Sequence, residues 1–137
     1  MTDLTITAAS VVPGSGAVIE HGTAGASITA GQAVYLDSAT NTYKLADCDN
    51  ASSSVRTVRG IATHGASSGQ PLAVQTSGAI TIGATIAAGV VYCLSDTAGA
   101  IRPVADQGSG DYTQVIGVGL TTASLGVNIY NSGAAVA

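Results

Sequence analysis

The feature that most constrains the fold of this 137-residue chain is an internal repeat. Two segments, beginning at Ile28 and Ile86, carry the same short landmarks in the same order, at an offset of about 55–59 residues. The matched stretches are residues 28–36 with 86–94, 44–47 with 102–106, 59–63 with 116–121, and 68–78 with 125–133. Because a solenoid needs at least three repeats, two copies predict two similar units that pack against each other.

Hydrophobic residues within each copy follow the alternation that is typical of strands. Apolar side chains recur at every second position in residues 34–36, 72–76, 80–82 and 127–129. Gly, Asn, Ser and Asp clusters separate these runs, and no capped helical pattern extends over three turns. The pattern predicts an all-β fold, a small β-sandwich or barrel built from two similar β units. We expect one β domain over residues 28–137, with repeat copies at about 28–85 and 86–133.

The first 27 residues lie outside the repeat and predict an extended N-terminal arm, residues 1–27. Turn-forming residues dominate this arm, and one short strand is expected at residues 17–20. We expect the arm to be ordered partly by something that it touches. Residues 1–5 have no positively charged or long apolar region, so no secretory signal is expected. Residues 131–137 are expected to form a loose tail.

Charge is scarce in this chain and narrows its possible partners. Only 9% of the residues are charged, against about 25% in ordinary soluble domains, and the formal net charge is −4. Four basic residues give no electrostatic footprint for nucleic acid. The most apolar stretch, at residues 79–94, is shorter than the roughly 20 residues of a membrane-spanning helix. We therefore expect no nucleic-acid partner and no membrane partner.

No group of residues in the sequence predicts catalysis. Nothing places His21 and His64 beside each other or beside a carboxylate, and residues 14–16 lack the spacing of the hydrolase nucleophile motif. Cys48 and Cys93 are far apart without a metal-type spacing, and we expect two small buried thiols. The chain is therefore expected not to be an enzyme, and to have no catalytic residue, no cofactor and no metal site.

Several aspartates have simpler interpretations than ion binding. Asp47, Asp49 and Asn50 resemble the start of an oxygen-rich calcium loop, but the glycine and the distal glutamate of that motif are missing. A solvated turn is expected there. Asp37 and Asp96 follow the tyrosine-containing strands of both copies, and we expect each side chain to close a turn on its own backbone.

The remaining candidates are tyrosines and arginines. Tyr35 and Tyr92 are interpreted as equivalent positions of the two copies, and packing in the core is favoured over stacking on a sugar or a base. Arg56 and Arg59 are the only closely spaced cations and form a candidate polar interface. Three residues apart on a strand, they would point to opposite faces, which favours solvated charges at a strand edge.

The landmarks of the repeat resemble the capsid decoration proteins of tailed bacteriophages, also called capsid cement proteins. The resemblance covers roughly residues 28–133. It rests on Ala30-Gly31-Gln32-Ala33-Val34-Tyr35-Leu36-Asp37, Arg59-Gly60-Ile61-Ala62, Ala88-Gly89-Val90-Val91-Tyr92 and Ile116-Gly117-Val118-Gly119.

The resemblance implies a structural protein of the virion, made in the cytoplasm of the host bacterium. Such a protein binds the outside of the expanded phage head, commonly as a homotrimer, and bridges neighbouring subunits of the major capsid protein. By this resemblance the partners are the major capsid protein and further copies of this chain. The N-terminal arm is then the candidate capsid contact, through Val11, Val12, Ala17, Val18, Ile19 and Glu20.

A different class of function stays open at this point. The chain would then be a phage tail or surface module that binds carbohydrate through tyrosine stacking and aspartate hydrogen bonds. The absence of tryptophan is against this alternative.

Overall fold

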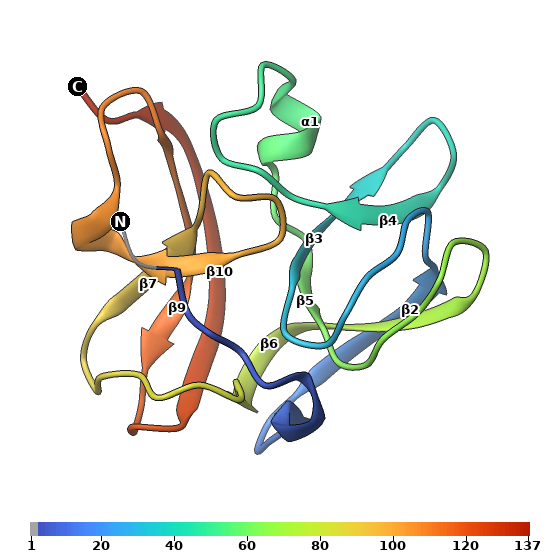
Figure 1. Ribbon diagram of the computed structural model, residues 1–137, viewed down its shortest axis with the longest axis horizontal. Helices are drawn as coiled ribbons and strands as arrows, with labels where there is room; N and C mark the ends of the chain where they lie inside the picture. Colours follow the sequence, from blue (N-terminus) through green and yellow to red (C-terminus); the bar gives the residue numbers. More distant parts are fainter. Residues whose placement is uncertain (1–2) are drawn as a thin grey trace.

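The computed structural model describes residues 3–137 and has the all-β fold that the sequence predicts (Figure 1). Its ten strands pair antiparallel in one curled sheet. The N-terminal region contains the 3-10 turn η1 (Ala8–Ser10), β1 (Val12–Pro13) and β2 (Val18–Thr23). The first copy contains β3 (Ala33–Asp37), β4 (Thr42–Leu45), α1 (Ser53–Arg56), β5 (Gly60–Ala62) and β6 (Pro71–Thr81). The second copy contains β7 (Val91–Leu94), β8 (Ile101–Pro103), the 3-10 turn η2 (Val104–Asp106), β9 (Tyr112–Gly119) and β10 (Ser124–Ala135).

The strands of the two copies pair in the same order. The sheet runs β4-β3-β5-β6 and then β10-β9-β7-β8. Each copy therefore has its second strand outermost, followed by its first, third and fourth strands. The fourth strands, β6 and β10, pair antiparallel with each other over residues 77–81 and 124–128 and join the two halves.

The pairing register corrects one equivalence that the sequence suggests. Val34 lies opposite Gly60 in the first copy, and Tyr92 lies opposite Gly117 in the second. The equivalent of Tyr92 is therefore Val34, and Tyr35 corresponds to Cys93. Tyr35 and Tyr92 are both buried in the main core, as predicted, but they occupy neighbouring rather than equivalent positions.

Gly60 and Gly117 allow the third strand of each copy to approach the fourth closely. A Cβ atom at Gly60 would run into the backbone carbonyl of Gln75 on β6, and one at Gly117 would run into the carbonyl of Gly126 on β10. Both positions are fully covered, so a larger residue would have to push the strands apart.

The N-terminal region belongs largely to the same sheet rather than forming a separate arm. β1 and β2 pair one after the other with β6, so the strand expected near residues 17–20 adds to its own domain. Upstream, the backbone of Leu4 bonds Ile101 and that of Thr7 bonds Gly83, both at 2.8 Å. At the other end, β10 continues to Ala135, which corrects the expectation of a loose tail over residues 131–137.

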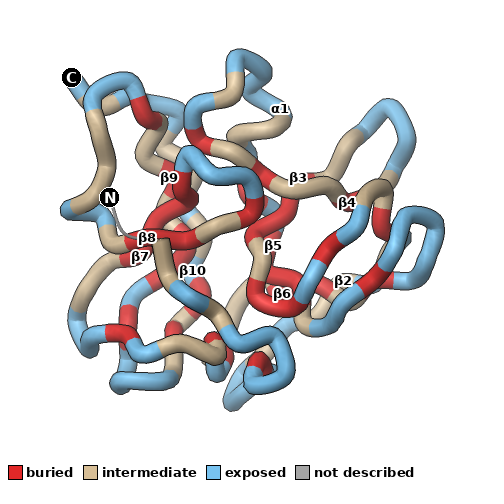
Figure 2. Tube along the Cα trace, viewed as in Figure 1, coloured by how far each residue is buried: buried red, intermediate tan, exposed pale blue. Residues whose placement is uncertain are grey.

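Buried residues occur along most strands of both halves (Figure 2), and their side chains form two clusters. The main cluster lies between the two halves and draws on both, with Ile61 and Ile80 from the first copy and Leu94 and Ile116 from the second. A smaller cluster is formed by side chains of β3, β4, β5 and β6, together with Ala24, Ile28 and Ala66 from the connecting segments. Burial of these β-branched and leucine side chains provides about 1.5–3 kcal/mol each. Among residues 3–137, no helix has the length and apolar character required to cross a membrane.

Candidate functional site

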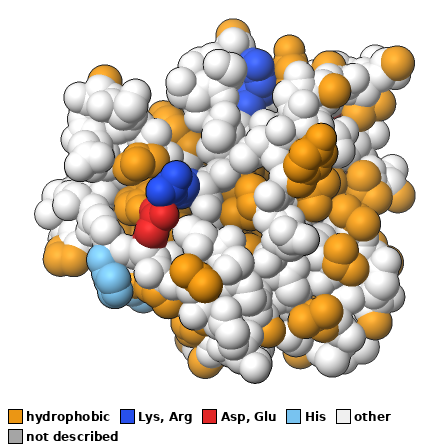
Figure 3. All heavy atoms as spheres, turned by 180° about the vertical axis from the view of Figure 1, so that it is seen from behind, with side chains coloured by type: hydrophobic (Ala, Val, Ile, Leu, Met, Phe, Trp, Pro, Cys, Tyr) orange, Lys and Arg blue, Asp and Glu red, His pale blue; other side chains and the backbone are white. Residues whose placement is uncertain are grey.

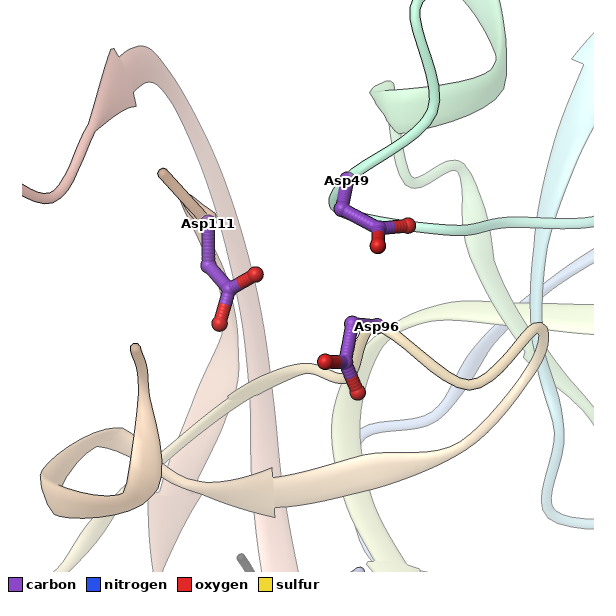
Figure 4. A group of neighbouring side chains, drawn as sticks. All are labelled: Asp49, Asp96 and Asp111. Atoms are coloured by element: carbon purple, nitrogen blue, oxygen red, sulfur yellow. The ribbon is translucent and has the colours of Figure 1, made fainter. Parts of the chain in front are cut away.

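Three aspartates from separate loops converge beside the second copy (Figure 4). Asp49 comes from the loop after β4, Asp96 from the loop after β7, and Asp111 immediately precedes β9. One oxygen from each carboxylate lies within 4.8 Å of the others. Three carboxylates are ligands of the kind that hard cations such as Ca²⁺ prefer, so these are the residues of the described chain that could hold a metal.

The cation inside this cluster is the side chain of Arg102 on β8. The side chain of Arg102 is fully buried, and it donates to Asp111 Oδ2 at 2.5 Å and to Asp96 Oδ1 at 3.0 Å. Its Nε donates to Gln107 Oε1 at 2.6 Å. A buried guanidinium needs such partners because an unpaired charge in the interior is very costly. The buried Arg102 side chain therefore connects β8 to the loop after β7, through Asp96, and to the loop before β9, through Asp111.

Burial affects a carboxyl group next to this cluster. Burial, together with a side-chain hydrogen bond that protonated Asp47 donates to the Asp49 carboxylate, raises the pKa of Asp47 to about 6. The Asp49 backbone also donates to Asp47 Oδ1 at 3.3 Å, and Asn50 accepts from the Ser52 backbone at 2.9 Å. Asp47 and Asn50 thus form the hydrogen-bonded turn that the sequence predicts, while the side chain of Asp49 faces the other two aspartates (Figure 4).

The first copy has an ion pair of its own at the position equivalent to Arg102, with a different aspartate and more access to solvent. Lys44 on β4 corresponds to Arg102 on β8, and Lys44 Nζ donates to Asp37 Oδ2 at 2.7 Å. As predicted, Asp37 also closes its turn by accepting from the Ala39 backbone at 3.0 Å. The expected turn-closing bond of Asp96 is made by Ser95 instead. In the strand register Ser95 is the equivalent of Asp37, and its Oγ accepts from the Thr97 backbone.

Sequence reasoning missed the Arg102 cluster, although a signal for it exists. In both copies a basic residue follows an aspartate by six or seven positions, on the next strand, in Asp37–Lys44 and Asp96–Arg102. Cross-strand pairs of opposite charge at this spacing predict an ion pair. That Arg102 would be buried, and that Asp111 would join it, depends on how the loops fold over the sheet.

Glu20 and Arg59, predicted as parts of two different contact regions, bind each other. The Arg59 guanidinium donates to both carboxylate oxygens of Glu20, at 2.7–3.0 Å, and the Tyr43 hydroxyl donates to Glu20 Oε1 at 2.6 Å. The hydrogen bond from Arg59 holds the pKa of Glu20 below its usual value, while burial raises the pKa of Tyr43 to about 12. This pair fixes β2 to the segment that leads into β5.

Arg56 lies in a helical turn rather than on a strand, which corrects the expected geometry. It is the last residue of α1, and its guanidinium lies 3.7 Å from the centroid of the Tyr112 ring. Nη1 donates to the backbone carbonyls of Asn50 and Ala51. Arg56 and Arg59 therefore do not lie on opposite faces of one strand, and each is engaged within its own chain.

The outer face of the sheet formed by β1, β2, β6, β9 and β10 carries no charged side chain at its centre. Registered neighbours on antiparallel strands point to the same side. The rows Val12–Thr81–Ser124, Val18–Ser77–Asn128 and Ala79–Gly126–Val118 therefore share one face, opposite the buried side chains of Ile80 and Leu125. In the view from behind, the half that holds β9 and β10 presents hydrophobic and uncharged atoms, with no Lys, Arg, Asp or Glu visible there (Figure 3).

The largest exposed hydrophobic side chains of the described chain gather mainly on these strands. They are Val12, Val18, Val118, Leu120 and Tyr130, with exposed fractions of 38–66%, and Val104 on η2 apart from them. We call the face formed by the first five, with the small residues between them, the outer face. At its centre Gly126 and Ala79 carry little or no side chain, and the Leu120 side chain lies against Gly126.

The residues predicted as capsid contacts in the N-terminal arm differ in their exposure to solvent. Val12 and Val18 lie on the outer face and are exposed, whereas Ala17 and Ile19 are half-buried. Val11 is buried in the main core, which corrects its assignment as a contact residue because a partner has no access to it.

The two cysteines are buried free thiols, as predicted. Burial raises the pKa of Cys48 to about 12 and that of Cys93 to about 11. The thiolate is the reactive form, so neither side chain is suited to act as a nucleophile.

Comparison with known proteins names no family for this arrangement. Neither a scan against models of protein families nor a search of curated proteins found a match to the chain.

Proposed function

We propose that this chain is a capsid decoration protein, which binds the outside of an expanded phage head as an oligomer and stabilises the contacts between major capsid protein subunits. The observation that carries the proposal is the uncharged outer face, on which exposed hydrophobic side chains alternate with Gly, Ala, Ser, Thr and Asn. The choice of the major capsid protein as the partner rests on the resemblance between the landmarks of the repeat and those of decoration proteins.

The chemistry of this face suits close contact with a second protein surface. Small side chains allow backbones to approach, and the desolvation cost of covering hydroxyls and amides is lower than that of covering charges. Each half-exposed Val or Leu would contribute about 1 kcal/mol when covered. Such a contact is modest for one chain, but an oligomer presents several copies at once and gains through effective concentration. A homotrimer, which the resemblance implies, would present three.

A protein that binds only the expanded lattice stabilises that state by mass action. The direct experiment is co-sedimentation of the purified chain with heads that lack decoration protein, in expanded and unexpanded form. We expect saturable binding to expanded heads and a rise in their thermal or mechanical resistance. Equal binding to both forms, or binding to neither, would contradict the proposal.

Carbohydrate binding has less support from the tyrosines. Tyr35, Tyr43 and Tyr92 are buried and the Tyr112 ring is covered by Arg56, which leaves Tyr130 as the exposed ring. Sugar sites commonly use aromatic faces for stacking, and a single ring on a flat surface offers little enclosure.

A further inference from the structure

The loop between β5 and β6, residues 63–70, covers the smaller of the two buried clusters. Ala66 of this loop is only 8% exposed and belongs to that cluster together with Ile28. The backbones of Ala66 and Ile28 exchange two hydrogen bonds of 2.9 Å, and the Ala24 N–H donates to the Gln70 carbonyl at 2.9 Å. The far end of the loop is therefore held by the segment that precedes β3.

The near end of the loop is joined to β6 through a histidine side chain. The Thr63 N–H donates to the Ala73 carbonyl at 3.0 Å, as in an ordinary antiparallel pair. The return bond does not reach a backbone carbonyl, because the Ala73 N–H donates to His64 Nε2 at 3.0 Å. An imidazole nitrogen thus takes the place of a backbone acceptor at the point where the chain leaves β5.

These contacts determine the protonation state of His64. A backbone N–H can only donate, so Nε2 must be the unprotonated nitrogen of the ring. The proton of the neutral ring is then on Nδ1, which donates to the Gly65 carbonyl at 2.9 Å. A second proton would make Nε2 a donor that faces another donor, and the bond from Ala73 would be lost. Because His64 is exposed, solvent can deliver that proton directly.

The elements around the loop give a protonated His64 no carboxylate partner. Their titratable and charged groups are His21 and Glu20 on β2, Tyr43 and Lys44 on β4, and Arg59 before β5. Glu20 already accepts hydrogen bonds from Arg59 and Tyr43. His21 lies opposite Ala73 in the strand register, and its side chain has no hydrogen-bond partner among residues 3–137. Residues 24–32 and β6 contain no titratable side chain.

We propose that His64 is a pH-sensitive latch, which joins the 63–70 loop to β6 while its ring is neutral and releases the near end of the loop when the ring is protonated. Histidine is the side chain whose charge ordinarily changes between about pH 5 and 8. The folded chain requires the neutral ring, so the latch is intact at the upper end of this range and is lost as the pH falls. This device does not depend on the proposed binding to a capsid.

The test is amide hydrogen exchange of the full chain at about pH 7.5 and about pH 5. Protection factors are compared, because they correct for the intrinsic effect of pH on exchange. The net contribution of one hydrogen bond corresponds to about a fivefold change in an equilibrium constant, so we expect the protection of the Ala73 amide to fall about fivefold at the lower pH. The Ile82 amide, which bonds the Ala123 carbonyl just beyond the other end of β6, is the internal reference for global stability.

Three variants separate the latch from other effects of pH. His64→Gln keeps a side-chain acceptor that does not titrate, and His64→Leu removes the acceptor, so the pH dependence of Ala73 protection should disappear in both. His21→Gln removes the other histidine, which lies opposite the same residue, and should keep the native pH dependence. Unchanged Ala73 protection in the native protein, a pH dependence that survives in His64→Gln, or its loss in His21→Gln would overturn the proposal.

Discussion

Removing the buried charge of Arg102 should destabilise the protein strongly. In Arg102→Met, a side chain of similar length fills the site, but Asp111 and Asp96 lose their cation and Gln107 loses a donor. The side chain of Asp111 is only 10% exposed and keeps just the Gly108 backbone donor at 2.8 Å. Breaking a buried ion pair in this way costs about 3–5 kcal/mol, a large share of the 5–15 kcal/mol that stabilises a typical domain.

The repeat supplies a matched control for this variant. Lys44→Met removes the equivalent cation of the first copy, where the side chains of Lys44 and Asp37 are 33% and 22% exposed. Water and salt screen an ion pair that is open to solvent, so losing this pair should cost far less than losing the buried Arg102 pair. Urea unfolding followed by far-ultraviolet circular dichroism gives the free energy of unfolding of each variant by linear extrapolation.

Two results would show that the buried charge of Arg102 does not stabilise the fold. One is a free energy of unfolding for Arg102→Met that equals that of Lys44→Met within the error of the measurement. The other concerns Arg102→Met/Asp111→Asn, which removes the uncompensated carboxylate and should be more stable than Arg102→Met alone; a less stable double variant would show that charge is not the cause.

Three further predictions concern single positions. The pKa of Asp47 is raised to about 6 in the folded state, so its carboxyl group favours the folded state at low pH, and that contribution is lost as the pH rises from about 4 to 6. Relative to the native protein, Asp47→Asn should gain about 1 kcal/mol in free energy of unfolding between pH 4 and pH 7. A difference between the two proteins in thermal melts that does not change with pH would contradict this. Cys48 and Cys93 should react with an aromatic disulfide reagent only at the rate of unfolding, and rapid labelling of the folded chain would show that a thiol is accessible. Gly117→Ala should cost about 1–3 kcal/mol because its Cβ meets the Gly126 carbonyl, whereas Gly65→Ala, with its nearest atom at 3.5 Å, should be close to neutral in urea midpoints.

Much of the fold follows from the sequence because strand periodicity and the repeat are local or self-similar signals. The alternation in residues 72–76 and 127–129 identifies β6 and β10, and the shared landmarks anticipate two sets of strands with one pairing order. The register is harder to predict. The sequence alignment of the two copies matches Tyr35 with Tyr92 and Asp37 with Asp96. The strand pairing shows that this alignment is wrong by one residue in these strands.

The placement of residues 3–23 and of the Arg102 cluster could not be predicted. The N-terminal strands pair with residues of β6 that lie 48–69 positions further along the chain (Thr23↔Pro71 to Val12↔Thr81), and no local pattern specifies that pairing. Likewise, Asp49, Asp96, Arg102 and Asp111 meet only after three loops have folded over the sheet. Such long-range contacts depend on tertiary structure, whereas propensity and spacing report on neighbouring residues.

If the outer face binds the shell of a phage head, as proposed, charges placed on that face should weaken binding to heads. Deleting the N-terminal arm is unsuitable, since Val11 and β2 belong to the fold. Val118→Lys/Leu120→Lys instead puts two charges on the outer face at exposed positions, and Ala51→Lys/Val104→Lys adds the same charges elsewhere. In co-sedimentation with undecorated expanded heads, we predict at least a tenfold loss of affinity for the first variant, about 1.4 kcal/mol, and native binding for the second. Equal binding by both variants would show that the outer face does not contact the shell.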